Sequence, residues 1–381
     1  MEKSIVLAGY KRSPFTFAKK GELALNRPDD MAGLVVKNLI ETIGVDPSDI
    51  EDLIMGCAFP EGEQGYNVAR QVVNQAGLPV SVAGVTVNRF CGSSMQAIHM
   101  AAGAIQMGSG DAIIAAGMES MSRIPMGGFN PMPSPFLMET YPQAYISMGE
   151  TAENLAKKYK IDRQRQDEFA VMSHKKAASA VAAGYFKDEI LPIMNAEGRL
   201  IDQDGCIRPD SNLEALSALK PAFDQDGSVT AATASPLTDG IVAVMVCTEE
   251  YARTNKLEIM ARIKSIAVAG CGAEVMGIGP VASSRKALER AGVTLEDIDV
   301  IELNEAFAAQ SLSVIEELGI DVEKVNIDGG AIALGHPLGA SGGRITAKAA
   351  QIMKRQGKKL ALSTMCIGGG QGISTVLEAV D

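Results

Sequence analysis

The sequence predicts an α/β protein made of two similar layered units, with a long irregular segment inserted between them. Three observations support this prediction. Apolar strands alternate with helical stretches in the first and the last third of the chain. Residues 41–59 and 289–307 resemble each other at an offset of 248, which is 289 − 41. Residues 121–236 lose this alternation, and the chain of 381 residues is long enough for two α/β units.

The first third alternates between short apolar runs and helical runs. We expect strands at 4–9, 52–58, 84–88 and 111–117, and helices at 30–43, 67–77 and 92–107. An aspartate is expected to cap the start of the first helix, and Gly44 is expected to end it. Strands that alternate with helices of this length predict a mostly parallel sheet with helices on its faces.

The middle of the chain follows a different pattern. Residues 121–142 are dense in Met, Pro and Gly, which predicts an irregular loop. Two helices are expected next, at 150–160 and 163–183, with Asp162 as the cap of the second. The run IVAVMVCT at 241–248 predicts a buried strand, and strands and helices then alternate to the end of the chain.

The repeat keeps its register through several elements. Gly44 matches Gly292 and Phe59 matches Phe307, and nearly the same offset aligns GSS after Cys91 with GAS in the second copy. We therefore expect two copies packed about a pseudo-twofold axis, with equivalent strand ends and loops meeting near that axis. The expected domains are an N-terminal domain of residues 1–120 plus 237–259, an inserted loop domain of residues 121–236, and a C-terminal domain of residues 260–381.

Composition excludes several classes of function. The formal net charge of −11 argues against nucleic-acid binding through general basicity. The six cysteines are scattered with no CxxC pair, so neither a disulfide framework nor a structural zinc site is expected. The N-terminus lacks the pattern of a secretory signal, and no run reaches the roughly 18 apolar residues of a membrane span. We expect a reduced, cytoplasmic, globular protein.

Cys91 is the first candidate for chemistry. It lies in NRFCGSSM, where an apolar strand is expected to meet a helix. Unpaired backbone N–H groups and the macrodipole at a helix N-terminus lower the pKa of a thiol, which favours a nucleophile here. The alternative is a buried, inert cysteine, which is the commoner fate of a lone cysteine.

His336 is the second candidate, in the glycine-rich segment GGAIALGHPLGASGG. Glycine lets the backbone come close to a ligand, and Pro337 stiffens the loop. The other histidines are interpreted as a packing residue, His99, and a solvent-facing residue, His174. The alternative is a turn with an incidental histidine; a nucleotide P-loop is disfavoured because the pattern GxxxxGK[ST] is missing.

Cys366 is the third candidate. It follows an apolar strand and precedes the glycines that begin at Gly368, so backbone N–H groups there can face a bound oxygen; the alternative is a flexible connection. Asn304 lies at a strand-to-helix joint of the second copy, where it can hold a water, donate to an oxyanion or cap a helix. Two cysteines and one histidine beside glycines predict thiol nucleophilic catalysis, with the second thiol as acid and base.

Four segments carry a family resemblance. VNRFCGSSMQA, ELNEAFAAQ, GGAIALGHPLGASGGR and TMCIGGGQG, in this order, resemble the four signature segments of the thiolases. The resemblance extends from RSPF near the start to the last strand. It implies the thiolase fold, with two similar α/β domains and an inserted loop domain that covers coenzyme A (CoA). It also implies a homodimer or homotetramer, and association with the hydratase/dehydrogenase subunit of fatty-acid β-oxidation.

The resemblance implies roles for five residues. Cys91 is the nucleophile that becomes acylated, and His336 takes its proton and later contributes to an oxyanion hole. Cys366 exchanges a proton with the acetyl α-carbon or with the CoA thiol, and Asn304 orients a water that completes this first hole. The second hole uses the backbone N–H groups of Cys91 and Gly368.

The resemblance also implies contacts with CoA, which acts as a substrate; no metal and no redox cofactor is expected. Arg208 matches the arginine that meets the CoA nucleotide, and Ser235 the serine that contacts pantetheine. Met148 and Met276 would line the channel for the acyl and pantetheine groups. Helix capping and core packing explain these four residues equally well.

One departure from the family separates two subclasses. Biosynthetic acetoacetyl-CoA thiolases usually have a histidine where this chain has Ser147, so the chain resembles the degradative 3-ketoacyl-CoA thiolases. We expect cleavage of 3-oxoacyl-CoA substrates longer than four carbons. The alternatives are a biosynthetic-type acetoacetyl-CoA thiolase and a catalytically inactive acyl-CoA-binding protein. A ketoacyl synthase would need a second histidine at Asn304 or Cys366, and nothing recommends a scaffold protein.

Overall fold

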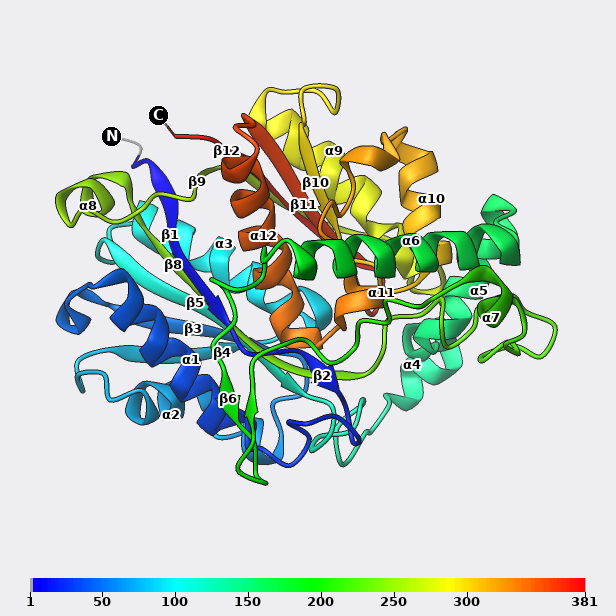
Figure 1. Ribbon diagram of the computed structural model, residues 1–381, viewed down its shortest axis with the longest axis horizontal. Coiled ribbons are helices and arrows are strands. Elements are labelled where there is room, and N and C mark those ends of the chain that lie inside the picture. The colour runs from blue at the N-terminus through cyan, green and yellow to red at the C-terminus, as the bar shows by residue number, and fades with distance from the viewer. Residues whose placement is uncertain (1–2, 381) are drawn as a thin grey trace.

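The computed structural model describes residues 3–380, and ten of its strands form one mixed sheet (Figure 1). Its order is β10-β11-β12-β9-β1-β8-β5-β3-β4, and β2 pairs with β8. The strands are β1 (Ile5–Arg12), β2 (Thr16–Phe17), β3 (Asp52–Cys57), β4 (Ala83–Val87), β5 (Ala112–Ser120), β8 (Thr238–Thr248), β9 (Ala261–Gly270), β10 (Val300–Leu303), β11 (Leu360–Ile367) and β12 (Gln371–Glu378). The inserted segment adds a small hairpin of β6 (Ile193–Met194) and β7 (Leu200–Ile201).

The sequence repeat is visible in the sheet. The order β3-β5-β8-β1 of the first half returns, reversed, as β9-β12-β11-β10 in the second half. Within each of these sets of four strands one pair is parallel, β3 with β5 and β10 with β11, and the following pairs are antiparallel. The two halves meet at β1 and β9, where Val6 pairs with Arg262 and Leu7 with Ala261.

The expectation of a mostly parallel sheet is therefore wrong. Parallel pairing is confined to β3 with β4 and β5, and to β10 with β11. The turn from β11 to β12 holds only residues 368–370, and a connection this short can join only antiparallel strands. In the first half β8 takes the place equivalent to β12, but it reaches the sheet only after the inserted segment.

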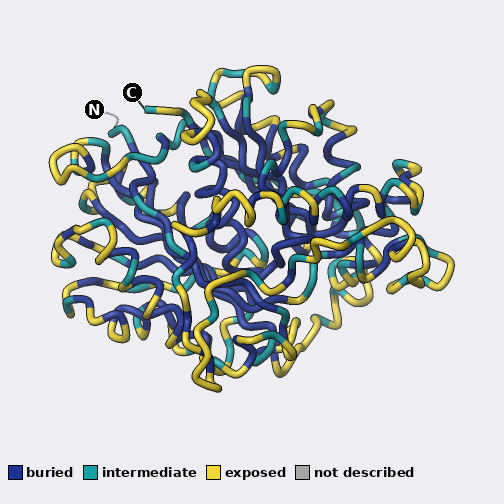
Figure 2. The backbone as a smooth tube through the Cα atoms, in the orientation of Figure 1, coloured by how far each residue is buried: buried dark blue, intermediate teal, exposed yellow. Residues whose placement is uncertain are grey.

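Helices cover both faces of the sheet. They are α1 (Pro28–Ile43), α2 (Val68–Gln75), α3 (Ser93–Gln106), α8 (Glu249–Thr254), α9 (Gly279–Ala291), α10 (Ala308–Leu318), α11 (Ala331–Leu334) and α12 (Leu338–Arg355). Helices α3 and α12 pack together between the two halves, whereas α1 and α9 lie on the outer faces (Figure 1). Figure 2 shows the buried strands and central helices inside an exposed rim of loops.

Strand β8 explains why the run IVAVMVC is apolar at every position. Its odd-numbered residues from Ile241 to Cys247 pack against α1, and its even-numbered residues from Val242 to Val246 pack against α3 and α12. A strand covered on both faces needs apolar side chains on both. The predicted buried strand at 241–248 is thus confirmed, and it begins earlier, at Thr238.

The predicted end of the first helix is confirmed, but its predicted start is wrong. Gly44 ends α1 in the left-handed conformation, with a φ of 74°. No aspartate caps the start: Arg27 occupies the N-cap, and Pro28 is the first helical residue. Proline has no N–H to satisfy and a fixed φ that suits the first turn, so the helix begins before the aspartates.

The inserted segment contributes α4 (Pro135–Thr140), α5 (Met148–Tyr159), α6 (Arg163–Ala182) and α7 (Leu213–Ser217). Asp162 caps α6 as predicted, through a bond from the Arg165 N–H. Helix α6 lies across the second half, beside α10 and α11 (Figure 1).

A buried ion network holds this segment to both halves. Arg12 of β1 binds Asp204 with two hydrogen bonds of 2.6 and 2.7 Å and binds Glu189 at 2.7 Å. Lys348 of α12 pairs with Glu189 and lies 3.7 Å from Asp328. Because these side chains are almost completely buried, removal of one partner would leave an uncompensated charge in the interior.

No helix between residues 3 and 380 is both long and apolar enough to cross a membrane.

Candidate active site

Cys91 lies in a tight turn that leads from β4 into α3. Residues 90–92 form one turn of 3₁₀ helix, and α3 starts at Ser93. Phe90 has a φ of +41°, which a side chain larger than glycine adopts only when its surroundings hold it there. Cys91 packs against two apolar clusters, one of which includes Met95 and Ile367 and the other Ala58 and Leu338.

The expected lowering of the Cys91 pKa is wrong. The pKa of Cys91 is raised to about 11, chiefly by burial, and the charge of the nearby Glu119 carboxylate contributes to the increase. The backbone N–H groups of Gly368 and of Cys91 itself lower the pKa without compensating for burial. The N-terminus of a helix lowers the pKa of a thiol, but burial raises this pKa by more once protein atoms have replaced the surrounding water. The resting sulfur is therefore a protonated thiol.

His336 and Asn304 form a hydrogen-bonded pair. The imidazole Nε2 lies 3.4 Å from Asn304 Nδ2, and its Nδ1 lies 2.6 Å from Ser341 Oγ. Ser341 donates to the Pro337 carbonyl at 2.9 Å, so its oxygen accepts from Nδ1–H. This assignment leaves a lone pair on Nε2, which accepts from the Asn304 amide.

The His336 ring is neutral in this environment. Burial and the positive charge of Arg344 lower the pKa of His336 to about 3. The opposite atom of the Asn304 amide, Oδ1, is buried and has no hydrogen-bond partner among residues 3–380. A buried acceptor of this kind is normally satisfied by water or by a ligand.

Cys366 is close enough to Cys91 for the two thiols to influence each other. Burial raises the pKa of Cys366 well above its ordinary value, and the charge of Cys91 raises it further. Cys366 lies near the end of β11, paired with Gly372 of β12. It packs with Met148, Met276 and Phe307, so its surroundings are apolar.

Two packing clusters join the thiols to the His336–Asn304 pair. Leu338, two residues after His336, packs in the same cluster as Cys91. Ala306, two residues after Asn304, packs in the same cluster as Cys366. Cys91 comes from the first half and the other three side chains from the second half, and the turn that carries Cys91 contacts both α12 and β11.

The residues expected to bind CoA occupy different surroundings. Met148 and Met276 pack with Cys366, and the Ser235 N–H donates to the Ala306 carbonyl at 2.9 Å. Arg208 is exposed, and its guanidinium carbon lies 5.6 Å from the centre of the Phe17 ring. Arg208 forms no hydrogen bond or ion pair with either thiol in the described part of the chain.

The interpretation of His174 as solvent-facing is wrong, whereas that of His99 as a packing residue is confirmed. His174 is buried, and its Nδ1 accepts a hydrogen bond of 3.2 Å from the Arg208 N–H. It therefore supports the backbone of a residue expected to meet CoA. His99 is buried in α3, with Nε2 2.8 Å from Thr375 Oγ1.

Two polar residues that act on His336 and Cys91 were not predicted from the sequence to do so. Ser341 fixes the His336 ring, and its position one turn into the following helix is the signal that would have identified it. Glu119 raises the pKa of Cys91. Its position as a lone acidic residue directly after the apolar run AIIAAGM is the feature that would have identified it.

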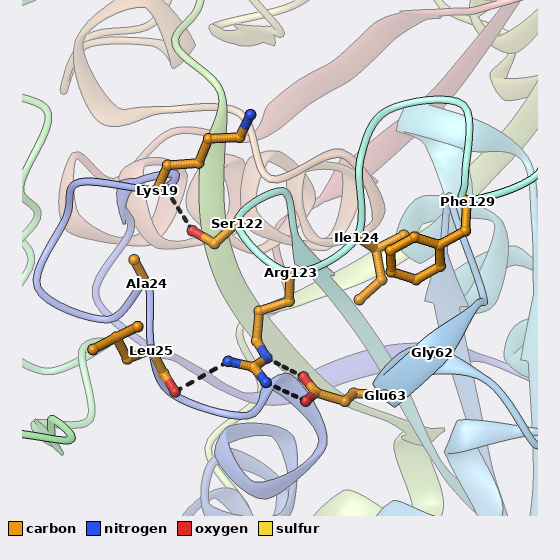
Figure 3. Close-up of a pocket in the computed structure, with 9 residues that line it drawn as sticks. All are labelled: Lys19, Ala24, Leu25, Gly62, Glu63, Ser122, Arg123, Ile124 and Phe129. Carbon is orange, nitrogen blue, oxygen red and sulfur yellow. Dashed lines mark hydrogen bonds and ion pairs between the residues drawn. The ribbon is translucent and has the colours of Figure 1, made fainter.

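An open pocket lies away from these side chains (Figure 3). Arg123 in this pocket pairs with Glu63 and donates to the Leu25 carbonyl, so its guanidinium is already occupied. The pocket is lined by Lys19, Ala24, Leu25, Gly62, Glu63, Ser122, Arg123, Ile124 and Phe129, and includes none of the predicted site residues. Residues 3–380 contain no group of three or more His, Cys, Asp or Glu side chains arranged to hold a metal ion.

Two family models match the chain: the thiolase N-terminal domain over residues 5–250 and the thiolase C-terminal domain over residues 257–379. The 3-ketoacyl-CoA thiolase of Bacillus subtilis (strain 168) is 47% identical over 99% of this chain and 100% of its own length. The enzyme of the same name from Aliivibrio fischeri (strain ATCC 700601 / ES114) is 48% identical over 99% of both chains.

Solved structures show the same relationship. The crystal structure of human mitochondrial 3-ketoacyl-CoA thiolase matches with a TM-score of 0.91 and 36% identity, covering 100% of this chain and 99% of its own. A second structure of that human enzyme, in complex with CoA, matches with the same TM-score and identity and is covered over 98% of its length.

Proposed function

This chain belongs to the thiolase family, and we propose that it cleaves 3-oxoacyl-CoA with CoA to give acetyl-CoA and a shortened acyl-CoA. Three observations support the proposal: the hydrogen-bonded His336–Asn304 pair, the electrostatic influence of Cys91 on Cys366, and the Gly368 N–H that acts on Cys91. Relatives 47–48% identical over 99% of the chain are named 3-ketoacyl-CoA thiolase, which supports the substrate class.

The first half-reaction transfers the acyl group to sulfur. The Cys91 thiol loses its proton to the lone pair on His336 Nε2, and the sulfur attacks the C3 ketone of the substrate. The C2–C3 bond then breaks, its electron pair enters the enolate of acetyl-CoA, and an acyl-Cys91 thioester remains. Because the thiol has a pKa of about 11 and the imidazole a pKa of about 3, this proton transfer needs the substrate in place.

Negative charge develops on the reacting carbonyl oxygens, and hydrogen-bond donors that the fold already holds in place stabilise it. We assign one oxyanion hole to the N–H groups of Cys91 and Gly368, and the other to His336 together with a water held by Asn304. The unpartnered Asn304 Oδ1 is consistent with such a water. Removal of one oxyanion-hole donor typically costs about 10²–10³ in rate.

Cys366 supplies the proton that completes acetyl-CoA. Its raised pKa keeps it protonated, so it can donate to C2 of the enolate and then accept a proton from the incoming CoA thiol. The CoA sulfur attacks the acyl-Cys91 thioester, the acyl group moves to CoA, and Cys91 leaves as the thiolate that recovers its proton. No step requires a metal or a redox cofactor.

We assign CoA contacts to Arg208, Ser235, Met148 and Met276, on the inserted segment and near Cys366. We also propose the domain organisation given above: residues 1–120 plus 237–259, the inserted residues 121–236, and residues 260–381. A homodimer or homotetramer, a cytoplasmic location, and association with the hydratase/dehydrogenase of β-oxidation complete this proposal.

The proposed acyl preference is for substrates longer than four carbons. Ser147 caps α5 together with Glu150, in the position where biosynthetic members usually carry a histidine. The alternative is a biosynthetic-type thiolase restricted to acetoacetyl-CoA.

A thiolysis assay over a series of 3-oxoacyl-CoA chain lengths tests both the reaction and the subclass. We expect turnover with substrates beyond four carbons; activity with acetoacetyl-CoA alone would refute the subclass. Cys91→Ala should abolish thiolysis while CoA binding, measured by calorimetry, is retained. If the wild-type chain bound acyl-CoA without turnover, the remaining alternative, an inactive binding protein, would be correct.

A further inference from the structure

Glu119 is a buried carboxylate without a basic partner. It lies near the end of β5, is 1% exposed, and forms no ion pair with any lysine, arginine or histidine between residues 3 and 380. Burial of an ionised carboxylate costs several kcal/mol unless other groups replace its lost hydration. Such a residue beside a candidate nucleophile therefore calls for a physical explanation.

Four N–H donors replace the water around Glu119. Its Oε2 accepts from the Ala58 N–H at 2.8 Å and from the Gly339 N–H at 3.0 Å. Its Oε1 accepts from Gln64 Nε2 at 2.9 Å and from the Phe59 N–H at 3.3 Å. One carboxylate thus joins the segment after β3, in the first half of the chain, to the start of α12, in the second half.

The junction at Gly339 is tight. A Cβ at this position would lie 2.2 Å from the Met118 carbonyl oxygen and 3.0 Å from Glu119 Oε2, so only glycine fits. Gly339 is the second residue of α12, where the first backbone N–H groups have no partner within the helix. A carboxylate is favourable there because it accepts such an N–H and lies at the positive end of the helix dipole.

The atoms that Glu119 holds form the walls around the proposed nucleophile. Ala58, Phe59 and Leu338 all pack in the cluster that includes Cys91. The Phe59 ring lies 5.9 Å from the ring of Phe90, the residue before Cys91. His336 precedes the clamped Gly339 by only three residues, so a shift of Gly339 would also move the imidazole.

We propose that Glu119 is a positioning residue, which clamps the segment after β3 to the start of α12 and so sets the distance between Cys91 and His336. This inference rests on the proposed roles of those two residues. The charge of Glu119 itself opposes ionisation of Cys91, because it raises the pKa of the thiol. The benefit of Glu119 is therefore geometric, and its charge and its hydrogen bonds have opposite effects that can be separated.

Glu119→Gln removes the charge and disrupts the clamp. In either orientation of the new amide, its NH₂ group would face N–H donors and could not accept their hydrogen bonds. We expect kcat for thiolysis to fall about 10²-fold, the loss typical of a displacement of about 1 Å at a catalytic site. Alkylation of Cys91 by iodoacetamide, followed on the Cys91 peptide by mass spectrometry, should shift to lower pH. Cys366 of β11 also interacts electrostatically with this thiol, and it is unchanged in the variant.

Glu119→Asp keeps the charge but shortens the reach of the side chain. We expect kcat to fall while the pH profile of Cys91 alkylation stays at the wild-type position. Glu153→Gln is the matched control: Glu153 of α5 is buried and accepts from the Ser228 N–H at 3.0 Å and from the Val229 N–H at 2.8 Å. Its loss should lower stability without moving the Cys91 profile.

Several results would overturn the inference. A kcat of Glu119→Gln within threefold of wild type would exclude the clamp, and so would an equal shift of the Cys91 profile in Glu153→Gln. If both Glu119 variants lost the native near-ultraviolet circular dichroism spectrum, Glu119 would be a folding residue instead. A wild-type chain that binds CoA but catalyses no thiolysis would refute the proposed function. A wild-type chain that catalyses thiolysis, together with a Glu119→Gln variant of unchanged kcat, would refute only the inference about Glu119.

Discussion

Replacement of Ser341 by alanine tests the proton arrangement of the proposed base. The change removes the hydroxyl that accepts from His336 Nδ1 at 2.6 Å and leaves a buried N–H without a partner. An unsatisfied buried donor costs about 1–3 kcal/mol, which corresponds to roughly 5- to 150-fold in an equilibrium constant. The ring can escape this cost by moving its proton to Nε2, where it would oppose the Asn304 amide at 3.4 Å and remove the lone pair that takes the thiol proton.

We therefore expect kcat for thiolysis to fall about 10- to 100-fold in Ser341→Ala, with CoA binding unchanged. Ser313→Ala is a matched control, because Ser313 is a buried helical serine whose hydroxyl bonds the carbonyl four residues earlier, at 2.8 Å, and touches no histidine. Steady-state kinetics of both variants at neutral pH provide the measurement. A Ser341→Ala enzyme with kcat within twofold of wild type, or an equal loss in Ser313→Ala, would refute this account of the tautomer.

Three further predictions concern ionisation and buried charge. Because the pKa of Cys91 is about 11, its alkylation rate in the free enzyme should rise about tenfold per pH unit up to that region; a plateau below pH 9 would contradict this. The contribution of each histidine that burial holds neutral should fall by about 1.4 kcal/mol per unit as the pH drops from 6.5 towards 4, because only the unfolded chain binds these protons. Urea unfolding between pH 7 and pH 5 measures the slope, and His99→Gln should change it by up to about 1.4 kcal/mol per pH unit relative to wild type. The histidines concerned are His99, His174 and His336, whose pKa values burial lowers to about 3, 4 and 3. Arg12→Ala should lower the free energy of unfolding by about 3–5 kcal/mol, since Asp204 and Glu189 would lose their buried partner; a loss below 1 kcal/mol in equilibrium denaturation would show that Lys348 compensates.

The two-copy architecture could be predicted because the repeat preserves turn residues and apolar spacing together. Gly44 ends α1 in the left-handed conformation, and Gly292 does the same for α9. The direction of β8 could not be predicted, because it follows an inserted segment of more than one hundred residues. A connection of that length is compatible with either parallel or antiparallel pairing.

The positions of the candidate site residues at turns and strand ends could be predicted from the sequence, but their electrostatics could not. A strand-to-helix turn correctly indicated where Cys91 lies, yet the sign of its pKa shift depends on how much water the fold removes. The prediction for His174 is wrong for the same reason: neighbouring lysines suggest an exposed face, whereas α6 packs against the chain around Arg208, and this contact encloses the imidazole. Burial is a property of tertiary packing, and local composition reports it poorly.

At two glycines, the seam between the halves leaves no space for a larger side chain. A methyl group on Gly117 would lie 2.3 Å from the Gly339 carbonyl oxygen, and one on Gly343 would lie 2.9 Å from Val242. Such close contacts resist rotation of one half relative to the other, so groups that lie far apart in the sequence are held as one preassembled unit. Dividing the chain at the repeat would yield two fragments that each expose half of a reaction centre, and activity would return only when they recombine.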